Sequence, residues 1–181
     1  GEVSVPLLVR TPMGGRRGYG PTHSQCLEKL FLGVPGLAVV ATSLRHDPRA
    51  LLRRAILEDE RPTLLVETKI DYAHELGAPL PPGYSLGEVG MSMIYPTLWL
   101  TPDVGSTEVT IVTYGGMLPH VEQALTRLQI ERELQTEVFV VTELGAPPWK
   151  DIEASLGRTH RLLTVEEGGE AAGFGSYLAG R

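Results

Sequence analysis

Short apolar runs alternate with amphipathic segments through the first 75 residues of the chain. Three runs have the length of buried strands: residues 5–9, 37–41 and 63–66. Between them, one helix is predicted over residues 25–32, and a second begins at Asp47, with Pro48 in its first turn. The second helix has one apolar face, made by Leu51, Leu52, Ala55 and Ile56.

The same alternation returns in the last third of the chain. Strands are predicted there at residues 108–113, 137–141 and 162–165. Helices are predicted at residues 117–128 and 151–156. Because strands separated by helices through short connections form parallel sheets, both parts of the chain are predicted to be α/β units with mostly parallel strands.

Residues 76–106 differ from the segments on either side. They begin with APLPPGYS, which is rich in proline and glycine, and they show no clear hydrophobic period. We therefore expect an interdomain linker here. The pattern divides the chain into residues 1–75, a linker at 76–106 and residues 107–181.

Composition and charge exclude several classes of protein. The 181 residues include 16 basic and 22 acidic ones, a net charge of -6 without any basic block, which argues against a nucleic-acid or membrane-surface protein. No long apolar run and no signal peptide are present, so we expect a cytoplasmic protein. The single Cys26 excludes an internal disulfide, and the scattered histidines do not favour a metal site.

The loop GYGPTHSQC, residues 18–26, holds the strongest candidate for chemistry. Its glycines let backbone approach a ligand, Pro21 stiffens the turn, and Ser24 stands at the expected N-cap of the helix at 25–32. His23 then lies at a helix entrance after a strand end, where an imidazole can exchange a proton near neutral pH. The alternative is a surface or structural histidine. Tyr19 and Thr22 are candidates for the lining of the same loop.

Two other patterns give weaker hypotheses. Cys26 can be imagined as a nucleophile paired with His23, but a buried core cysteine is favoured because no third orienting group is visible. Near the end of the chain, GFGSYLAG resembles a dinucleotide-binding turn but lacks the third glycine at the required spacing, so nucleotide binding there is not supported.

The order of motifs resembles one family. GPTHSQC, then FLGVPGLAVVATS, then DPRALLRRAILEDERPTLLVETK are similar to the beta subunits of the thiamine-diphosphate-dependent 2-oxoacid dehydrogenases of the pyruvate and branched-chain type. EVTIVTYGGM, ASLGRTHRLLTVEEG and AGFGSYLAG resemble the C-terminal domain of the same transketolase-like superfamily. The resemblance implies that residues 1–75 are the second half of a pyrimidine-binding domain. Residues 107–181 would be a Rossmann-like transketolase C-terminal domain that stops early.

The chain departs from the family pattern in several places. Gly33 stands where the family usually has a second histidine. One extra residue and a missing asparagine follow the second helix, so the family's potassium site is not carried over. The segment at 140–149 lacks the usual arginine and aspartate, and the linker at 76–106 is longer than usual. The chain therefore resembles a divergent and partial member.

The resemblance implies that the chain takes part in the decarboxylation of a 2-oxo acid. Members of the family decarboxylate a 2-oxo acid on thiamine diphosphate with Mg²⁺ and pass the acyl group to a lipoyl group on an acyltransferase partner. The cofactor lies between alpha and beta subunits, with His23 implied at the mouth of the site as a proton donor. The activating glutamate is expected upstream of residue 1, and the GDG…N signature, absent here, in an alpha partner. No cofactor or metal ligand is assigned to this chain, which is expected to be inactive alone and to form α2β2-type assemblies through beta–beta contacts.

Two alternatives remain open at this point. One is a thiamine enzyme of the transketolase or deoxyxylulose-phosphate synthase type with a sugar acceptor, although its histidine motif reads THQ where this chain has THSQ. The other is a module without catalytic activity that serves assembly. Dependence of turnover on a lipoyl domain separates the first alternative from the dehydrogenase.

Overall fold

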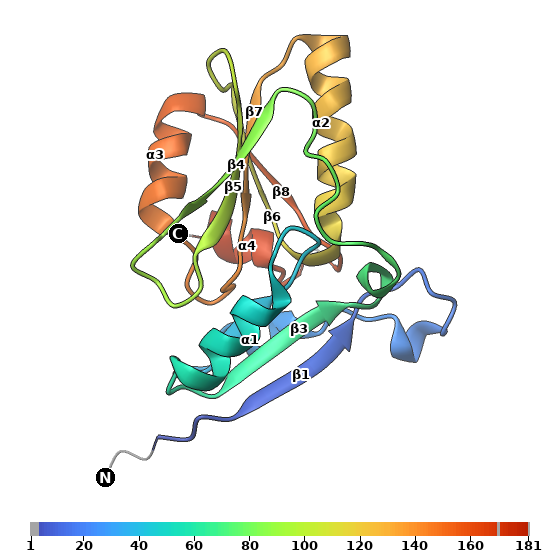
Figure 1. Ribbon diagram of the computed structural model, residues 1–181, viewed down its shortest axis with the longest axis vertical. Coiled ribbons are helices and arrows are strands. Elements are labelled where there is room, and N and C mark those ends of the chain that lie inside the picture. Colours follow the sequence, from blue (N-terminus) through green and yellow to red (C-terminus); the bar gives the residue numbers. More distant parts are fainter. Residues whose placement is uncertain (1–3, 170, 181) are drawn as a thin grey trace.

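The computed structural model describes residues 4–169 and 171–180, and it holds two α/β units that follow one another along the long axis (Figure 1). The first unit has three parallel strands in the order β1-β3-β2: β1 (Leu8–Met13), β2 (Ala38–Ala41) and β3 (Thr63–Thr68). Helix α1 (Pro48–Leu57) covers one face of this sheet. Its predicted cap is confirmed, because the Asp47 carboxylate accepts the Arg49 N–H at 2.9 Å.

Two expectations for the first unit were wrong in detail. The first strand begins at Leu8 and not at residue 5, because its pairing with β3 begins at Leu8 and Thr63. Val5 and Leu7 are therefore exposed. Ile56 is also exposed, since Leu51 and Ala55 are the residues of α1 that become buried against the sheet.

The helix predicted at 25–32 is replaced by a short 3₁₀ turn, η2 (Glu28–Phe31), and another 3₁₀ turn, η1 (Pro21–His23), precedes it. Ser24 follows η1 and caps no helix. Tertiary contacts explain the difference, because the Gly14 N–H donates to the Gln25 carbonyl and the side chains of Cys26 and Glu28 turn into the core. These contacts hold the segment in a shape that an α-helix cannot adopt.

The second unit is a five-stranded sheet in the order β4-β5-β7-β6-β8. Its strands are β4 (Tyr84–Val89), β5 (Thr97–Pro102), β6 (Val109–Thr113), β7 (Thr136–Val140) and β8 (Leu162–Val165). Strands β6, β7 and β8 are parallel, and β4 and β5 are antiparallel. Helices α2 (Leu118–Arg132) and α3 (Trp149–Thr159) flank the sheet, and α4 (Phe174–Ala179) follows (Figure 1). The predicted α/β class with mostly parallel sheets is confirmed.

The segment 76–106 holds two strands that the sequence pattern did not predict. β4 and β5 form a hairpin that joins the second sheet through β7. β4 escaped prediction because it is an edge strand whose side chains from Ser85 to Glu88 are all exposed, so no alternation is visible. The domain boundaries at 75 and 107 stay a prediction, while the description of this segment as a linker without strands is corrected.

The connection between β4 and β5 reaches back to the first unit. Tyr95 is fully buried there, in the core that α1 forms with the first sheet. The Arg54 guanidinium donates to the Ile94 carbonyl at 3.0 Å, and the Thr142 hydroxyl donates to the Pro96 carbonyl at 2.6 Å. The hairpin therefore ties the two units together.

Candidate functional site

The glycine loop at residues 14–20 lies at the carboxyl end of β1, next to the carboxyl end of β3. Gly14 has a φ of 89°, and an added Cβ would come within 3.2 Å of Thr68 Cγ2 and 3.1 Å of Glu167 Oε2. The neighbouring Gly15 N–H donates to Glu167 Oε1 at 2.8 Å. The loop is thus packed closely between β3 and the segment that follows β8, and small residues are required at this approach.

His23 is the last residue of η1, and its side chain is exposed. It lines a cavity of about 420 Å³ together with Thr11, Pro12, Tyr19, Thr22, Gln25, Leu27 and Lys69. The Lys69 ammonium donates to the His23 carbonyl, which links the loop to the first residue after β3. The structure therefore brings together His23, Tyr19 and Thr22, as expected. The catalytic role of His23 stays a prediction.

Cys26 lies outside that cavity and faces the core. Burial is the main cause that raises the pKa of its thiol to about 12, and the nearby carboxylates of Glu28 and Glu167 raise it further. A thiol with this pKa holds its proton at neutral pH and is a poor nucleophile. The environment supports the core interpretation over a pair with His23.

A buried acid beneath the loop was not expected from the sequence. Glu28 is 3% exposed, and its Oε1 accepts the Tyr114 hydroxyl at 2.6 Å. Burial raises the pKa of Glu28, and its Oε2 has no partner among the described residues. Burial also raises the pKa of the Tyr114 hydroxyl. No local signal could have paired these side chains, which are separated by 86 positions.

The glycine-rich turn before α4 is occupied by a side chain of the protein itself. The Glu166 carboxylate accepts the backbone N–H groups of Phe174 and Gly175, both at 2.8 Å. An added Cβ at Gly173 would lie 2.6 Å from Glu166 Oε1. The glycines that resembled a dinucleotide loop therefore make room for this internal carboxylate.

A second cavity, of about 280 Å³, lies at the carboxyl ends of β2 and β3 and includes His46 and Asp71 in its wall. The His46 ring is fully engaged by Ser43 and Thr142, and burial lowers its pKa to about 4. Both carboxylate oxygens of Asp71 are buried without a partner among the described residues, and burial raises the pKa of this group. His46 is therefore a structural histidine.

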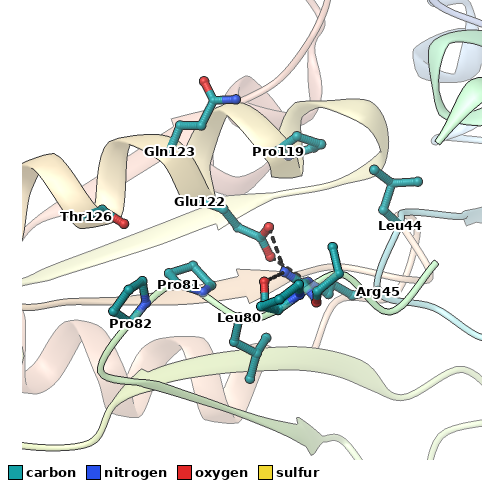
Figure 2. A pocket seen from close by; sticks show the side chains of 11 residues that line it. Leu44, Arg45, Leu80, Pro81, Pro82, Pro119, Glu122, Gln123 and Thr126 are labelled. Atoms are coloured by element: carbon teal, nitrogen blue, oxygen red, sulfur yellow. Dashed lines mark hydrogen bonds and ion pairs between the residues drawn. The ribbon is translucent and has the colours of Figure 1, made fainter. Parts of the chain in front are cut away.

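Figure 2 shows a third cavity, of about 370 Å³, in which the side chains of Arg45 and Glu122 point toward one another. The Arg45 guanidinium donates to both Glu122 oxygens, at 2.7 and 3.0 Å, and to the backbone carbonyls of Ala78 and Pro79. All of these contacts join the first unit to α2 and to the proline-rich segment. The arrangement serves structure, because the charged groups of Arg45 and Glu122 are paired with one another.

Neither a metal cluster nor a membrane span emerges in the part of the chain that the structure describes. Among those residues, no group of three or more His, Cys, Asp or Glu side chains is placed to hold a metal ion. No helix of residues 4–169 or 171–180 is long and apolar enough to cross a membrane.

Comparison with known proteins agrees with this architecture. The family model for the transketolase C-terminal domain matches residues 101–181. The mitochondrial pyruvate dehydrogenase E1 subunit beta-1 of Arabidopsis thaliana is 33% identical over 168 residues, 93% of this chain and 44% of its own length. The corresponding beta subunit of Porphyra purpurea is 32% identical over 178 residues, 98% of this chain and 50% of its own length. The chain thus spans about half the length of the curated relatives it matches.

A solved structure has the same fold over most of the chain. It is described as "Split gene transketolase, inactive beta4 tetramer", with a TM-score of 0.64 and 20% identity, and the match covers 96% of this chain and 52% of that one. Residues 101–181 match the model of the transketolase C-terminal domain, and nearly the whole chain is similar to about half the length of the pyruvate dehydrogenase E1 beta subunits.

Proposed function

We propose that this chain is the beta-type portion of a thiamine-diphosphate-dependent 2-oxoacid dehydrogenase, which decarboxylates a 2-oxo acid and passes the acyl group to lipoamide. One observation carries the proposal. His23 lines a cavity at the carboxyl ends of two parallel strands, where ligands bind in open α/β sheets. This part of the chain lies within the region that is similar to E1 beta subunits.

The proposed cofactor is thiamine diphosphate with Mg²⁺, and the described residues do not fit its metal-binding part. They hold no cluster of metal ligands, and the sequence has no GDG motif. We assign the diphosphate and the metal to an alpha-type partner, and we assign the role of the activating glutamate to none of the described residues. When bound, the cofactor supplies the carbanion chemistry.

His23 would supply proton transfer at the mouth of the shared site. Its imidazole is exposed at the wall of the cavity, so it can reach a substrate without a change in the loop. An imidazole can donate a proton to an oxygen or sulfur atom on which charge develops. The packing of Gly14 and Gly15 against Glu167 holds the loop that carries it. We therefore give His23 the role of general acid.

The proposed partners are an alpha subunit, a lipoyl acyltransferase and a second beta chain. Exposed apolar side chains on residues 5–9 and 27–34 support association, because isolated soluble domains rarely leave such groups uncovered. A cytoplasmic location stays an expectation from composition.

The sugar-transferring alternative shares the same fold, so the likeness to a transketolase structure at 20% identity does not favour it. That neighbour is described as an inactive tetramer of beta chains, but the likeness shows the fold alone and does not favour the assembly alternative either. Catalytic turnover with a partner decides between assembly and enzyme.

The test is reconstitution. The chain is placed within a full-length beta subunit, paired with an alpha subunit, and assayed for acyl transfer to a lipoyl domain. His23→Ala should lower this transfer by roughly 10²–10⁴-fold, the usual contribution of one general acid, with little change in melting temperature. His160→Asn serves as the control, because it removes an exposed imidazole away from the cavity and asparagine tolerates the positive φ there. Wild-type transfer in His23→Ala would remove His23 from the site.

A further inference from the structure

The carboxyl ends of the second unit's parallel strands pack against the first unit. Open α/β sheets bind ligands at this edge, yet here residues of the first unit lie against it. The Gly116 N–H donates to Thr68 Oγ1 at 2.9 Å, and the Tyr114 hydroxyl donates to Glu28 Oε1 at 2.6 Å. Tyr114 directly follows β6, and Glu28 begins η2. Glu28 is therefore an acid in the contact between the two units.

One oxygen of the Glu28 carboxyl group is unpaired in this contact. The side chain is 3% exposed, and its Oε2 has no hydrogen-bond partner among the described residues. The same oxygen is closed off from solvent. An ionised carboxylate with an unpaired oxygen is unfavourable in such a place, whereas a protonated carboxyl group is neutral and gains a donor. The geometry thus favours a proton on Glu28.

The charged and titratable groups around Glu28 come from three places in the chain. Cys26 and Lys29 lie on its own segment, Tyr114 follows β6, and Glu166 follows β8. Burial and the Glu166 carboxylate favour the neutral acid. The Tyr114 hydroxyl, the backbone N–H of Glu28 and the Lys29 ammonium favour the anion. Burial is the largest of these effects, so the pKa of Glu28 is raised above its ordinary value of 4.5.

We propose that Glu28 forms a pH-sensitive contact between the two units, which is strong while the carboxyl group is protonated and weakens when it ionises. In the neutral form, Glu28 accepts from Tyr114 and carries no charge opposite Glu166. The ionised form places a second carboxylate near Glu166 in a buried space, and movement of η2 toward solvent relieves that cost. His23 lies five positions before Glu28, so the contact would also set how firmly the candidate general acid is held. Only this last consequence rests on the proposed function.

The test follows the isolated chain by NMR and needs neither cofactor nor partner. The carboxyl carbon of Glu28, assigned through its own backbone, is followed from about pH 4 to about pH 8 and should titrate above 4.5. Hydrogen exchange of the Leu30 amide, which donates to the Leu27 carbonyl at 3.0 Å at the start of η2, reports on the contact. Because the folded pKa is raised, the protection of this amide should fall as the pH rises from about 5 to about 8, after correction for intrinsic exchange.

Three variants separate the charge of Glu28 from its structural role. Glu28→Gln keeps an acceptor for the Tyr114 hydroxyl but cannot ionise, so the protection of Leu30 should stay constant over this pH range. Tyr114→Phe removes the hydrogen bond and should lower the protection at both ends of the range. Glu153→Gln removes a carboxylate at an exposed position of α3 and should behave like the wild type.

The wild-type titration is decisive even where a variant fails to fold. A Glu28 carboxyl group that titrates at or below 4.5 would overturn the inference. A fall of Leu30 protection in Glu28→Gln equal to that in the wild type would overturn it as well. The reconstituted enzyme is a separate test, because its failure to turn over would refute the proposed function and leave the pH-sensitive contact standing. Normal turnover, with constant Leu30 protection in the wild type, would refute the contact and leave the enzyme standing.

Discussion

His46 Nε2 lies 2.9 Å from Thr142 Oγ1, so a histidine before α1 is joined to the segment after β7. On the other side of the ring, Nδ1 accepts the backbone N–H of Ser43 at 3.0 Å. The ring proton therefore sits on Nε2 and is donated to Thr142, whose own hydroxyl donates to the Pro96 carbonyl. This chain of bonds requires a neutral imidazole, because a protonated ring could not accept at Nδ1.

The first prediction concerns the stability of the fold at acidic pH. Burial lowers the pKa of His46 from 6.5 to about 4, so the unfolded state binds a proton more readily between these values. The contribution of His46 to stability is present above pH 6.5 and is lost as the pH falls toward 4. Urea unfolding should show about 2 kcal/mol less stability at pH 5 than at pH 7.5 from this group. In His46→Gln that part of the pH dependence should vanish; an unchanged dependence would contradict the assignment.

The second prediction concerns Asp71, whose contribution to stability is lost as the pH rises, in contrast to that of His46. Burial raises the pKa of Asp71, so the folded state holds the proton more tightly than the unfolded state. As the pH rises from the unfolded value of 3.8 through the raised one, stability is lost, and the charge is unfavourable at pH 7.5. Asp71→Asn should then stabilise the fold by about 1 kcal/mol at pH 7.5 and by almost nothing near pH 4. Glu153→Gln, at an exposed position, should change neither value. A destabilised Asp71→Asn would show that the charged carboxylate has a partner.

The third prediction concerns the ion pair of Arg45 and Glu122. The two side chains are only 7% and 17% exposed, so removal of one partner leaves the other desolvated and unpaired. Arg45→Met should lower the free energy of unfolding by about 3 kcal/mol, and Arg45→Met with Glu122→Leu should recover part of the loss. The exposed pair of Arg127 and Glu131 offers a matched control, because Arg127→Met should cost less than about 0.5 kcal/mol. Similar losses for Arg45→Met and Arg127→Met would refute a structural role for the buried pair.

The fourth prediction concerns the reactivity of the Cys26 thiol. With a raised pKa and a buried side chain, Cys26 should resist thiol reagents at pH 8 in the folded protein and should react with one equivalent after unfolding. Mass spectrometry of the modified protein measures both states. Rapid modification of the folded chain would revive the hypothesis that Cys26 is a nucleophile.

Features with local causes could be predicted from the sequence. β8 occupies the predicted residues 162–165, and β6 differs by one residue, because short runs of apolar side chains bounded by turn residues are typical of parallel strands, although β8 lies at the sheet edge with Leu162 and Leu163 exposed. The N-cap at Asp47 could be predicted because a cap depends only on the residues of its own helical turn. The class of fold follows from such elements and their alternation.

Features that depend on distant contacts could not be predicted. The 3₁₀ turns at 21–31 depend on Glu28 reaching Tyr114, and β4 depends on pairing with β5 at the edge of the sheet. In the candidate site, His23 and its glycine loop were visible in the sequence. Lys69 was not, because only the fold brings it to the His23 carbonyl from 46 positions away.

The position of Tyr95 has a consequence for the way the chain acquires its structure during synthesis. The last strand of the first unit, β3, ends at Thr68. The core between α1 and the first sheet nevertheless includes Tyr95, which leaves the ribosome almost thirty residues later. A nascent chain that stops before this residue would expose the apolar faces of Ala38, Val40 and Leu65 to solvent or to chaperones. The two units should therefore gain their final packing together, in one cooperative step, although their sheets are separate.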